Sequence, residues 1–485
     1  MIRFGFLLLF SALASRTHAE EARRYLEPST FAFSVSIEAM LPLLKLKEKV
    51  VANLRSYAET LEKQLADVQL AIRMYEELQR RASLNAMNFI QQFAVLRHMH
   101  LDWVKWLTIM RPDAERLQIQ ILQELQPQMP TNMDIVEAMK GIQRIQYTYD
   151  MEPADIAMGK LRGRQYNFKR WGAFDTFVFG VLCQLQGYYK DADAWLKLTQ
   201  DSYKRQDNPI QLAFHHWTYE HVLEYLMLAN MGLGKFKTAL GHAKELLVLQ
   251  PQDEYIQAKA QELSTKSDEQ KPEPSMPIDV NAELIKKLCR QNQSLPAGRL
   301  RCRYVRGEAL LPLKMEELSL NPAISLYHDM LSDGELSIVK RLASPLLKRN
   351  KITYREIDSY TDYMATRPWQ SAELSSSMHT KIDTLNRRIR HSIPGVSSIE
   401  SENLQVRNFG IGGHFLEHAT ADKDVITALL YLSNVEQGGE TYFASLNLRV
   451  PPQKGSLLVW QRTGDSQIEC PVIVGNKWVA TKRIQ

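Results

Sequence analysis

The hydrophobic pattern changes once along this chain, near residue 324, and that change restricts the fold more than any other feature. Before it, apolar residues recur at the spacing of amphipathic helices. After it, short segments rich in β-branched and aromatic residues are separated by Gly, Pro and Asn, which is typical of a sandwich or barrel. A length of 485 residues allows two to four domains. We therefore predict a multidomain α + β protein whose helices come first.

Residues 31–110 are predicted to form long helices that carry a heptad seam. From Val51, apolar residues follow at steps of three and four: Leu54, Ala58, Leu61, Leu65, Val68, Ile72 and Tyr75. This spacing is typical of a coiled coil, and the charged flanks favour self-association over packing on the same domain. A membrane-surface helix is disfavoured because the polar face mixes both signs of charge. We assign residues 20–145 to a helical dimerisation domain.

Residues 150–262 contain two helix-turn-helix units of tetratricopeptide type. The units are marked by Phe179, Gly180, Gly187, Tyr189 and Ala192, and by Gly234, Phe236, Ala239, Ala243 and Pro251. Such units form a concave face that binds extended peptides. Aromatic residues are dense here: Trp171, Tyr188, Tyr189, Trp217, Tyr219 and Tyr225. A groove of such rings suits polyproline II ligands, whereas the plainer interpretation places most of the rings in the core.

The first 19 residues are predicted to be a signal peptide, because Arg3 precedes an apolar run from Phe4 to Ala14 that is too short to span a bilayer. No later stretch predicts a transmembrane helix. The C-terminus is not a KDEL-type retrieval signal, so residence in the endoplasmic reticulum would require a retained partner. A formal net charge of +5 without a long basic block argues against nucleic-acid binding.

An oxidising compartment permits disulfides among the cysteines Cys183, Cys289, Cys302 and Cys470. Cys289 and Cys302 are close in sequence and flank a loop with Pro and Gly, so we predict that they pair. Asn292 in this loop begins a glycosylation sequon, which implies that the loop is exposed. The segment 264–280 is polar and proline-rich, and we assign residues 263–322 to a linker that contains both cysteines.

The C-terminal part is predicted to open with a helix and to continue as strands. Ser332 and Glu335 form a capping box for a helix that reaches about Lys348. The expected strands are Leu404–Phe409, Val425–Leu432, Glu440–Phe443, Gly455–Trp460 and Pro471–Ala480.

Two of these segments, residues 404–420 and 470–482, closely resemble the catalytic domain of collagen prolyl 4-hydroxylase α subunits. The stretch Cys-Pro-Val-Ile-Val-Gly-Asn-Lys-Trp-Val, beginning at Cys470, is specific to that family. The resemblance implies an Fe(II), 2-oxoglutarate dioxygenase on a double-stranded β-helix (jelly roll), which we assign to residues 323–485. It also implies 4-hydroxylation of proline in procollagen-like peptides, the use of ascorbate, location in the endoplasmic reticulum lumen and assembly with protein disulfide isomerase.

The iron site that the resemblance implies departs from the family pattern. The chemistry uses two histidines and one carboxylate. His418 matches the first histidine, whereas Thr420 replaces the aspartate and Gln467 replaces the second histidine. A hydroxyl and an amide are weak, neutral ligands. A rebuilt site that uses neighbours such as His414 is disfavoured, because ligand number and geometry must both be right.

The implied cosubstrate site is mixed, and the implied peptide-binding domain departs less from the family pattern than the catalytic domain does. Lys477 matches the lysine that pairs with the distal carboxylate of 2-oxoglutarate. Phe415 replaces a family tyrosine, and Gln485 aligns with a further histidine. Tyr225 matches a family tyrosine of the peptide-binding repeat.

Three functions are therefore compared. A weak or inactive α-subunit-like protein that binds proline-rich chains is favoured by the lost ligands. A working hydroxylase with an altered metal shell is the alternative. A structural subunit without peptide affinity is the third.

Overall fold

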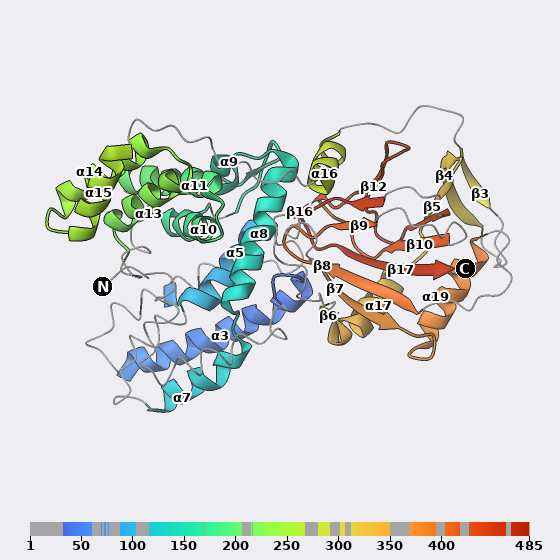
Figure 1. Cartoon of the computed structure of the whole chain (residues 1–485). Helices are drawn as coiled ribbons and strands as arrows, with labels where there is room; N and C mark the ends of the chain where they lie inside the picture. Colours follow the sequence, from blue (N-terminus) through green and yellow to red (C-terminus); the bar gives the residue numbers. More distant parts are fainter. Residues whose placement is uncertain are drawn as a thin grey trace.

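The structure of this protein is a computed structural model with a helical part and a sheet part side by side (Figure 1). It describes residues 33–60, 69, 72–73, 76, 88–102, 116–168, 170–205, 215, 217–266, 280–291, 301–305, 312–349, 369–393, 403–417, 426–461 and 467–484. The predicted mixture of helices and strands is confirmed. The predicted signal peptide lies outside the described residues. Among the helices that are described, none is long and apolar enough to cross a membrane.

The helical part begins with helices that share one core. These are α3 (Ile37–Thr60), α5 (Phe89–Arg97), α7 (Arg116–Leu125) and α8 (Asn132–Tyr149), with a π-helical turn at His98–Asp102 and a 3-10 turn at Gln126–Gln128. Leu54, from the predicted seam, is 1% exposed and packs in the same core as Phe93 of α5. This part of the seam therefore packs on its own domain. Val51 is buried in the same core, and Ile72 is partly buried against it. The side chains of the remaining seam residues lie outside the described part, and self-association stays a prediction.

A stack of antiparallel helices follows. Its elements are α9 (Pro153–Ala157), α10 (Ala173–Leu185), α11 (Tyr189–Lys204), α13 (Tyr219–Gly232), α14 (Phe236–Leu249) and α15 (Glu254–Lys266), with a small hairpin of β1 (Lys160–Leu161) and β2 (Arg164–Gln165). Helices α10 and α11 turn at Gly187 and helices α13 and α14 turn at Gly234, both with positive φ (81° and 72°), a conformation that glycine adopts without strain. Ala192 and Ala239 are fully buried, so the helices approach closely. The two helical hairpins thus lie where the repeat pattern predicts them.

The sheet part contains antiparallel sheets. The large sheet has the order β3 (Cys302–Val305), β4 (Leu313–Leu320), β5 (Ala323–His328), β14 (Leu457–Gln461), β10 (Ile426–Tyr431), β17 (Trp478–Ile484), β8 (Leu404–Phe409), β7 (Trp369–Leu374) and β6 (Lys348–Arg349). A smaller sheet has the order β13 (Leu448–Val450), β12 (Thr441–Phe443), β15 (Gln467–Glu469) and β9 (Phe415–Glu417), and β11 (Gln437–Gly438) pairs with β16 (Val472–Val474). Helix α16 (Val280–Arg290) precedes the sheets, and α17 (Asp333–Ala343), a 3-10 turn (Ser344–Leu346) and α19 (Thr380–His391) lie between strands.

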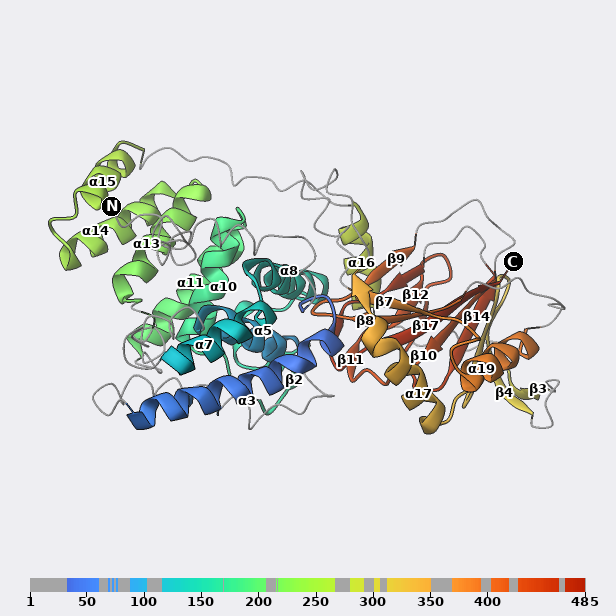
Figure 2. The ribbon, with the colours of Figure 1, turned by 90° about the horizontal axis from the view of Figure 1, so that it is seen from below.

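The side chains of successive strand residues point to opposite faces, and this alternation divides the molecule into layers. Val479 of β17 shares a core with Phe443 of β12, so the two sheets face one another. Ala480, the next residue, lies in a second core with Leu385 of α19, so α17 and α19 cover the other face of the large sheet (Figure 2). Ile468 of β15 belongs to the core of the helical part. The outer face of the small sheet is therefore covered by the helical part, where α8 and α16 meet the sheets (Figure 1).

Some predicted elements are confirmed and others need correction. Strand β8 has the predicted bounds, and Ser332 and Glu335 form the expected capping box at the start of α17. The single strand predicted at 471–480 is wrong, because a turn at Gly475 separates β16 from β17. The segment predicted to be a linker, residues 263–322, contains α16, β3 and β4. Strand β4 pairs with β5, and β3 pairs with β4 at the edge of the large sheet.

Candidate functional site

The predicted site residues fall into two groups. His418, Thr420, Asn292 and Gln485 lie outside the described residues. Gln467, Lys477, Phe415 and Tyr225 are described.

Gln467 begins strand β15 and lies next to β9. It pairs across the ladder with Glu417, the last residue of β9, and His418 is the next residue in the sequence. Gln467 is 4% exposed. Because Ile468 faces the helical part, Gln467 and Glu469 face the interior between the two sheets. The ladder therefore brings the position of Gln467 to the end of the strand that leads to His418.

Lys477 lies at the start of β17, and its ammonium is already paired. Its Nζ lies 2.5 Å from Oε2 of Glu469, and both side chains are almost completely buried. Nη2 of Arg407, on β8, lies 3.3 Å from the other carboxylate oxygen, Oε1, and donates a hydrogen bond of 2.7 Å to Thr481. Two buried cations thus share one buried carboxylate.

The sequence interpretation missed Glu469, the partner of Lys477, and Arg407, the second cation on the same carboxylate. Arg407 occupies the same face of β8 as Phe409, two residues on, and Glu469 occupies the same face of β15 as Gln467. A charged residue at an inward position of a predicted strand was the available signal. It does not say which charges meet, because these strands are far apart in sequence.

Burial and charge act against each other in this cluster. Burial lowers the pKa of Lys477 and of Arg407, because the charged forms lose their hydration. Burial also acts to raise the pKa of Glu469, but the charges of Lys477 and Arg407 outweigh it and hold that pKa below its ordinary value. The Arg407 guanidinium lies 4.3 Å from the ring centroid of Phe415, and the ammonium of Lys477 lies 4.8 Å from that of Phe409. These aromatic faces favour the cations.

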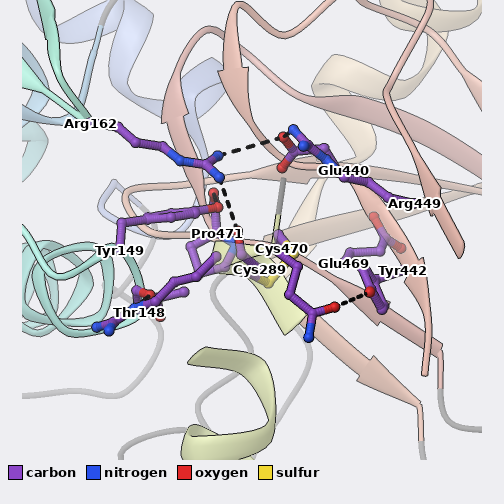
Figure 3. Close-up of a disulfide and its surroundings, with 12 residues drawn as sticks. Thr148, Tyr149, Arg162, Cys289, Glu440, Tyr442, Arg449, Glu469, Cys470 and Pro471 are labelled. Atoms are coloured by element: carbon purple, nitrogen blue, oxygen red, sulfur yellow. Dashed lines mark hydrogen bonds and ion pairs between the residues drawn. A yellow bond between two sulfur atoms is a disulfide. The ribbon is translucent and has the colours of Figure 1, made fainter. Parts of the chain in front are cut away.

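Next to this cluster, a disulfide joins Cys470 to Cys289 of α16 (Figure 3). Their Cα atoms lie 5.8 Å apart. The predicted pairing of Cys289 with Cys302 is therefore wrong. The amphipathic helix α16 buries Cys289 together with Ile285 and Leu288, whereas Cys302 is exposed as a free thiol on the edge strand β3.

Polar contacts around the disulfide fasten the same segment to the helical part. The hydroxyl of Tyr149 donates a hydrogen bond of 2.7 Å to the carbonyl of Pro471. Arg162 donates to the carbonyl of Cys289 at 3.3 Å and lies 3.9 Å from a carboxylate oxygen of Glu440 (Figure 3). The segment that follows β15 is thus held from outside by α8, α16 and the β1–β2 hairpin.

A second contact joins α8 to the loop between β8 and β9. A Cβ at Gly141 would lie 2.3 Å from the carbonyl oxygen of Ile411, so the two backbones touch. Arg144, one turn further along α8, donates to the carbonyl of Gly412 at 3.3 Å. This loop leads directly into β9 and the position of His418.

Asn408 connects the first helix to the turn that carries Lys477. Its side-chain oxygen accepts hydrogen bonds from the hydroxyl of Ser36 (2.7 Å) and the backbone N–H of Glu38 (3.0 Å). Its amide donates to the side chain of Asn476 (2.7 Å) and to the carbonyl of Lys477 (3.3 Å). The N-terminal helix therefore supports the buried ion pair through one side chain.

Tyr225 lies on α13 and is mostly buried. It is 9% exposed, and its ring centroid lies 5.8 Å from that of Phe177 and 6.4 Å from that of Trp217. Burial raises the pKa of its hydroxyl. Trp171 is buried as well, so this part of the aromatic set belongs mainly to the core, whereas Tyr219 is partly exposed.

Comparison with known proteins gives matches along the whole chain. Residues 36–163 match the family described as the prolyl 4-hydroxylase α-subunit, N-terminal region. The human prolyl 4-hydroxylase subunit alpha-1 is 28% identical, covering 93% of this chain and 93% of its own length. The human subunit alpha-3 is 27% identical, covering 99% of this chain and 96% of its own length. The chain is thus similar over nearly its whole length to prolyl 4-hydroxylase α subunits.

The similarity to α subunits includes the helical part, since the matched N-terminal region contains α3, α8 and most of the β1–β2 hairpin. Among solved structures, the viral collagen prolyl hydroxylase from Paramecium Bursaria Chlorella virus-1, in its 2OG complex, is similar over 33% of this chain and 94% of its own, with 20% identity and a TM-score of 0.27.

Proposed function

We propose that this protein is an α-subunit-like protein of the endoplasmic reticulum lumen that keeps peptide binding and subunit assembly but has lost efficient proline hydroxylation. The buried ion pair between Lys477 and Glu469 carries this proposal, because the lysine expected to bind the cosubstrate is neutralised within the chain. In this proposal the helical hairpins are tetratricopeptide units and the two facing sheets are a double-stranded β-helix.

The family's iron site does not fit the residues of this chain. Thr420 and Gln467 occupy two of the three ligand positions, and neither offers the imidazole or carboxylate that Fe(II) needs in a facial triad. Among the described residues, no cluster of three or more His, Cys, Asp or Glu side chains is placed to hold a metal. Hydroxylation with Fe(II), 2-oxoglutarate and ascorbate is therefore not part of the proposed function.

The family's 2-oxoglutarate site fits poorly for a separate reason. A free carboxylate that approaches Lys477 has to displace Glu469, which is completely buried and contacts both Lys477 and Arg407. Breaking such a pair leaves a buried charge without a partner, which costs about 3–5 kcal/mol. Weak binding of 2-oxoglutarate is therefore expected even where some metal is held.

Peptide binding is proposed for the helical stack of residues 150–262. Its turns and small helix contacts are intact, and Tyr188, Tyr189 and Tyr219 on it are partly exposed. A rigid aromatic surface suits proline-rich, collagen-like chains, because their extended conformation is already ordered. Protein disulfide isomerase is proposed as the partner that retains the protein in the lumen.

An active hydroxylase with an altered metal shell remains the second candidate. One observation favours it: Gln467 pairs with Glu417, the last residue of β9, and His418 follows Glu417 in the sequence. An amide oxygen there is a possible but weak metal ligand.

The test is expression of the full chain with protein disulfide isomerase, followed by iron content and peptide-dependent decarboxylation of 2-oxoglutarate. We expect little iron and no turnover above the peptide-free background. Restoring the ligands with Thr420→Asp and Gln467→His should raise iron content and serves as the matched control. Stoichiometric iron with robust turnover in the wild-type chain would refute the proposed loss of catalysis.

Peptide binding is tested separately by calorimetry with a polyproline peptide. Tyr225→Ala should weaken binding, and Tyr225→Phe distinguishes the hydroxyl from the ring. Tyr304→Ala is the control, because Tyr304 is 70% exposed on the edge strand β3, in the sheet part. No detectable binding by the wild-type chain would favour a structural subunit without peptide affinity.

A further inference from the structure

Among the described residues, two cations and one carboxylate form a contiguous buried cluster between the two sheets. Lys477 directly precedes β17, Arg407 lies on β8 and Glu469 lies on β15, and their side chains are 1%, 4% and 0% exposed. Two cations therefore face one carboxylate, in a region where burial strengthens every electrostatic interaction. Such a group is costly unless each charge is paired and hydrogen-bonded.

The pairing is incomplete in its hydrogen bonds. Oε1 of Glu469 and Nε of Arg407 are both buried, and neither has a hydrogen-bond partner among the described residues. The 3.3 Å contact between Arg407 and Oε1 is an ion pair without hydrogen-bond geometry. A buried polar atom without a hydrogen bond costs free energy and calls for an explanation, such as a bound water or ion or a functional role. Glu469 thus offsets the charge of the cations, but within the described part Nε of Arg407 is left without a hydrogen bond.

We propose that Lys477 and Arg407 form a binding site for a small carboxylate, and that Glu469 occupies this site from within the chain. The chain thereby carries its own ligand and excludes free carboxylates. This inference deepens the proposed loss of hydroxylation. It rests on the proposed function in one respect, because it takes the Lys477 site to be the family's 2-oxoglutarate site.

The structure also suggests a minimal ligand. Replacing Glu469 with alanine removes one methylene and the carboxylate, which are the four heavy atoms of acetate. The cations remain, with the rings of Phe409 and Phe415 beside them. Acetate should therefore fit the vacated space, and succinate or 2-oxoglutarate should show whether the space continues beyond it.

The experiment is chemical rescue of the full-length Glu469→Ala variant, produced with protein disulfide isomerase. The variant should melt on the order of 10 °C below the wild type, because two buried cations lose their partner. Acetate should restore at least half of that loss with saturation, as expected for a ligand that binds only the folded state. Chloride at equal ionic strength should not, and the wild type should not respond to acetate.

Glu440→Ala is the matched control. Glu440 is a buried carboxylate of the same part, but its partners Arg162 and Arg449 have side chains 20% and 28% exposed. Water can replace the lost carboxylate there, so we expect a smaller fall in melting temperature and no saturable restoration by acetate. Equal rescue of both variants would overturn the inference, as would a Glu469→Ala variant as stable as the wild type.

If Glu469→Ala does not fold, a double-mutant cycle decides. Glu469→Gln and Lys477→Met should each lower the melting temperature, and the combined variant should lose clearly less than the sum. Losses that simply add would overturn the inference. The proposed function fails on a different result, turnover by the wild-type chain, so the two failures are distinguishable.

Discussion

For Gly141→Ala, the tertiary structure decides whether the substitution raises or lowers the free energy of unfolding. Gly141 lies inside α8, where alanine in place of glycine stabilises a helix by about 1 kcal/mol. In this protein, however, the new Cβ would lie 2.3 Å from the carbonyl oxygen of Ile411, closer than the 3.0 Å below which neighbouring atoms must shift. Because that atom is backbone, the helix and the loop have to separate.

The expected cost can be estimated from these contacts. Overpacking of this kind costs about 1–3 kcal/mol. Separation also weakens the bond from Arg144 to Gly412, which is worth about 1.5–3 kcal/mol when a charged group takes part. After the gain in helix propensity, we expect Gly141→Ala to lower the free energy of unfolding by about 2 kcal/mol.

The measurement is the urea midpoint of the full-length chain, followed by tryptophan fluorescence. The control is Gly241→Ala on α14, because Gly241 is exposed and a Cβ there meets no atom within 4 Å. That control should gain about 1 kcal/mol, so the two variants should shift in opposite directions. A Gly141→Ala variant as stable as the wild type would refute the backbone contact between α8 and the loop.

Further predictions concern other contacts. Cys302 should react with a maleimide in the native protein without reductant, and a disulfide peptide containing Cys302 would contradict the pairing described above. Arg388 holds the pKa of Glu335 at about 2. The stability that this carboxylate contributes above pH 4.5 should therefore be lost as the pH falls from about 4.5 towards 2. In melts at a series of pH values, the melting temperature of Glu335→Gln should fall less over this range than that of the wild type. Asn408→Ala should lower stability by about 2 kcal/mol in urea titrations, because buried polar groups lose their partners, and an unchanged midpoint would exclude its bridging role.

Local features of the fold could be predicted from the sequence. Ser332 and Glu335 identify the start of α17, because a capping box involves only residues three apart. The alternation in residues 404–409 identifies β8 with its correct bounds. The motif that begins at Cys470 identified the family without any structure.

The tertiary structure decided what depends on distant residues. Cys289 pairs with Cys470 across 181 residues, because α16 turns its apolar side towards the small sheet, whereas proximity in sequence favoured Cys302. Lys477 meets Glu469 and Arg407 only because the order of strands brings β17, β15 and β8 around one interior. Sequence alone gave the resemblance to prolyl 4-hydroxylase α subunits and elements such as β8 and the start of α17, since these depend on local periodicity and motif. Packing decided that Glu469 neutralises Lys477, because burial removes the water that would otherwise screen each charge separately.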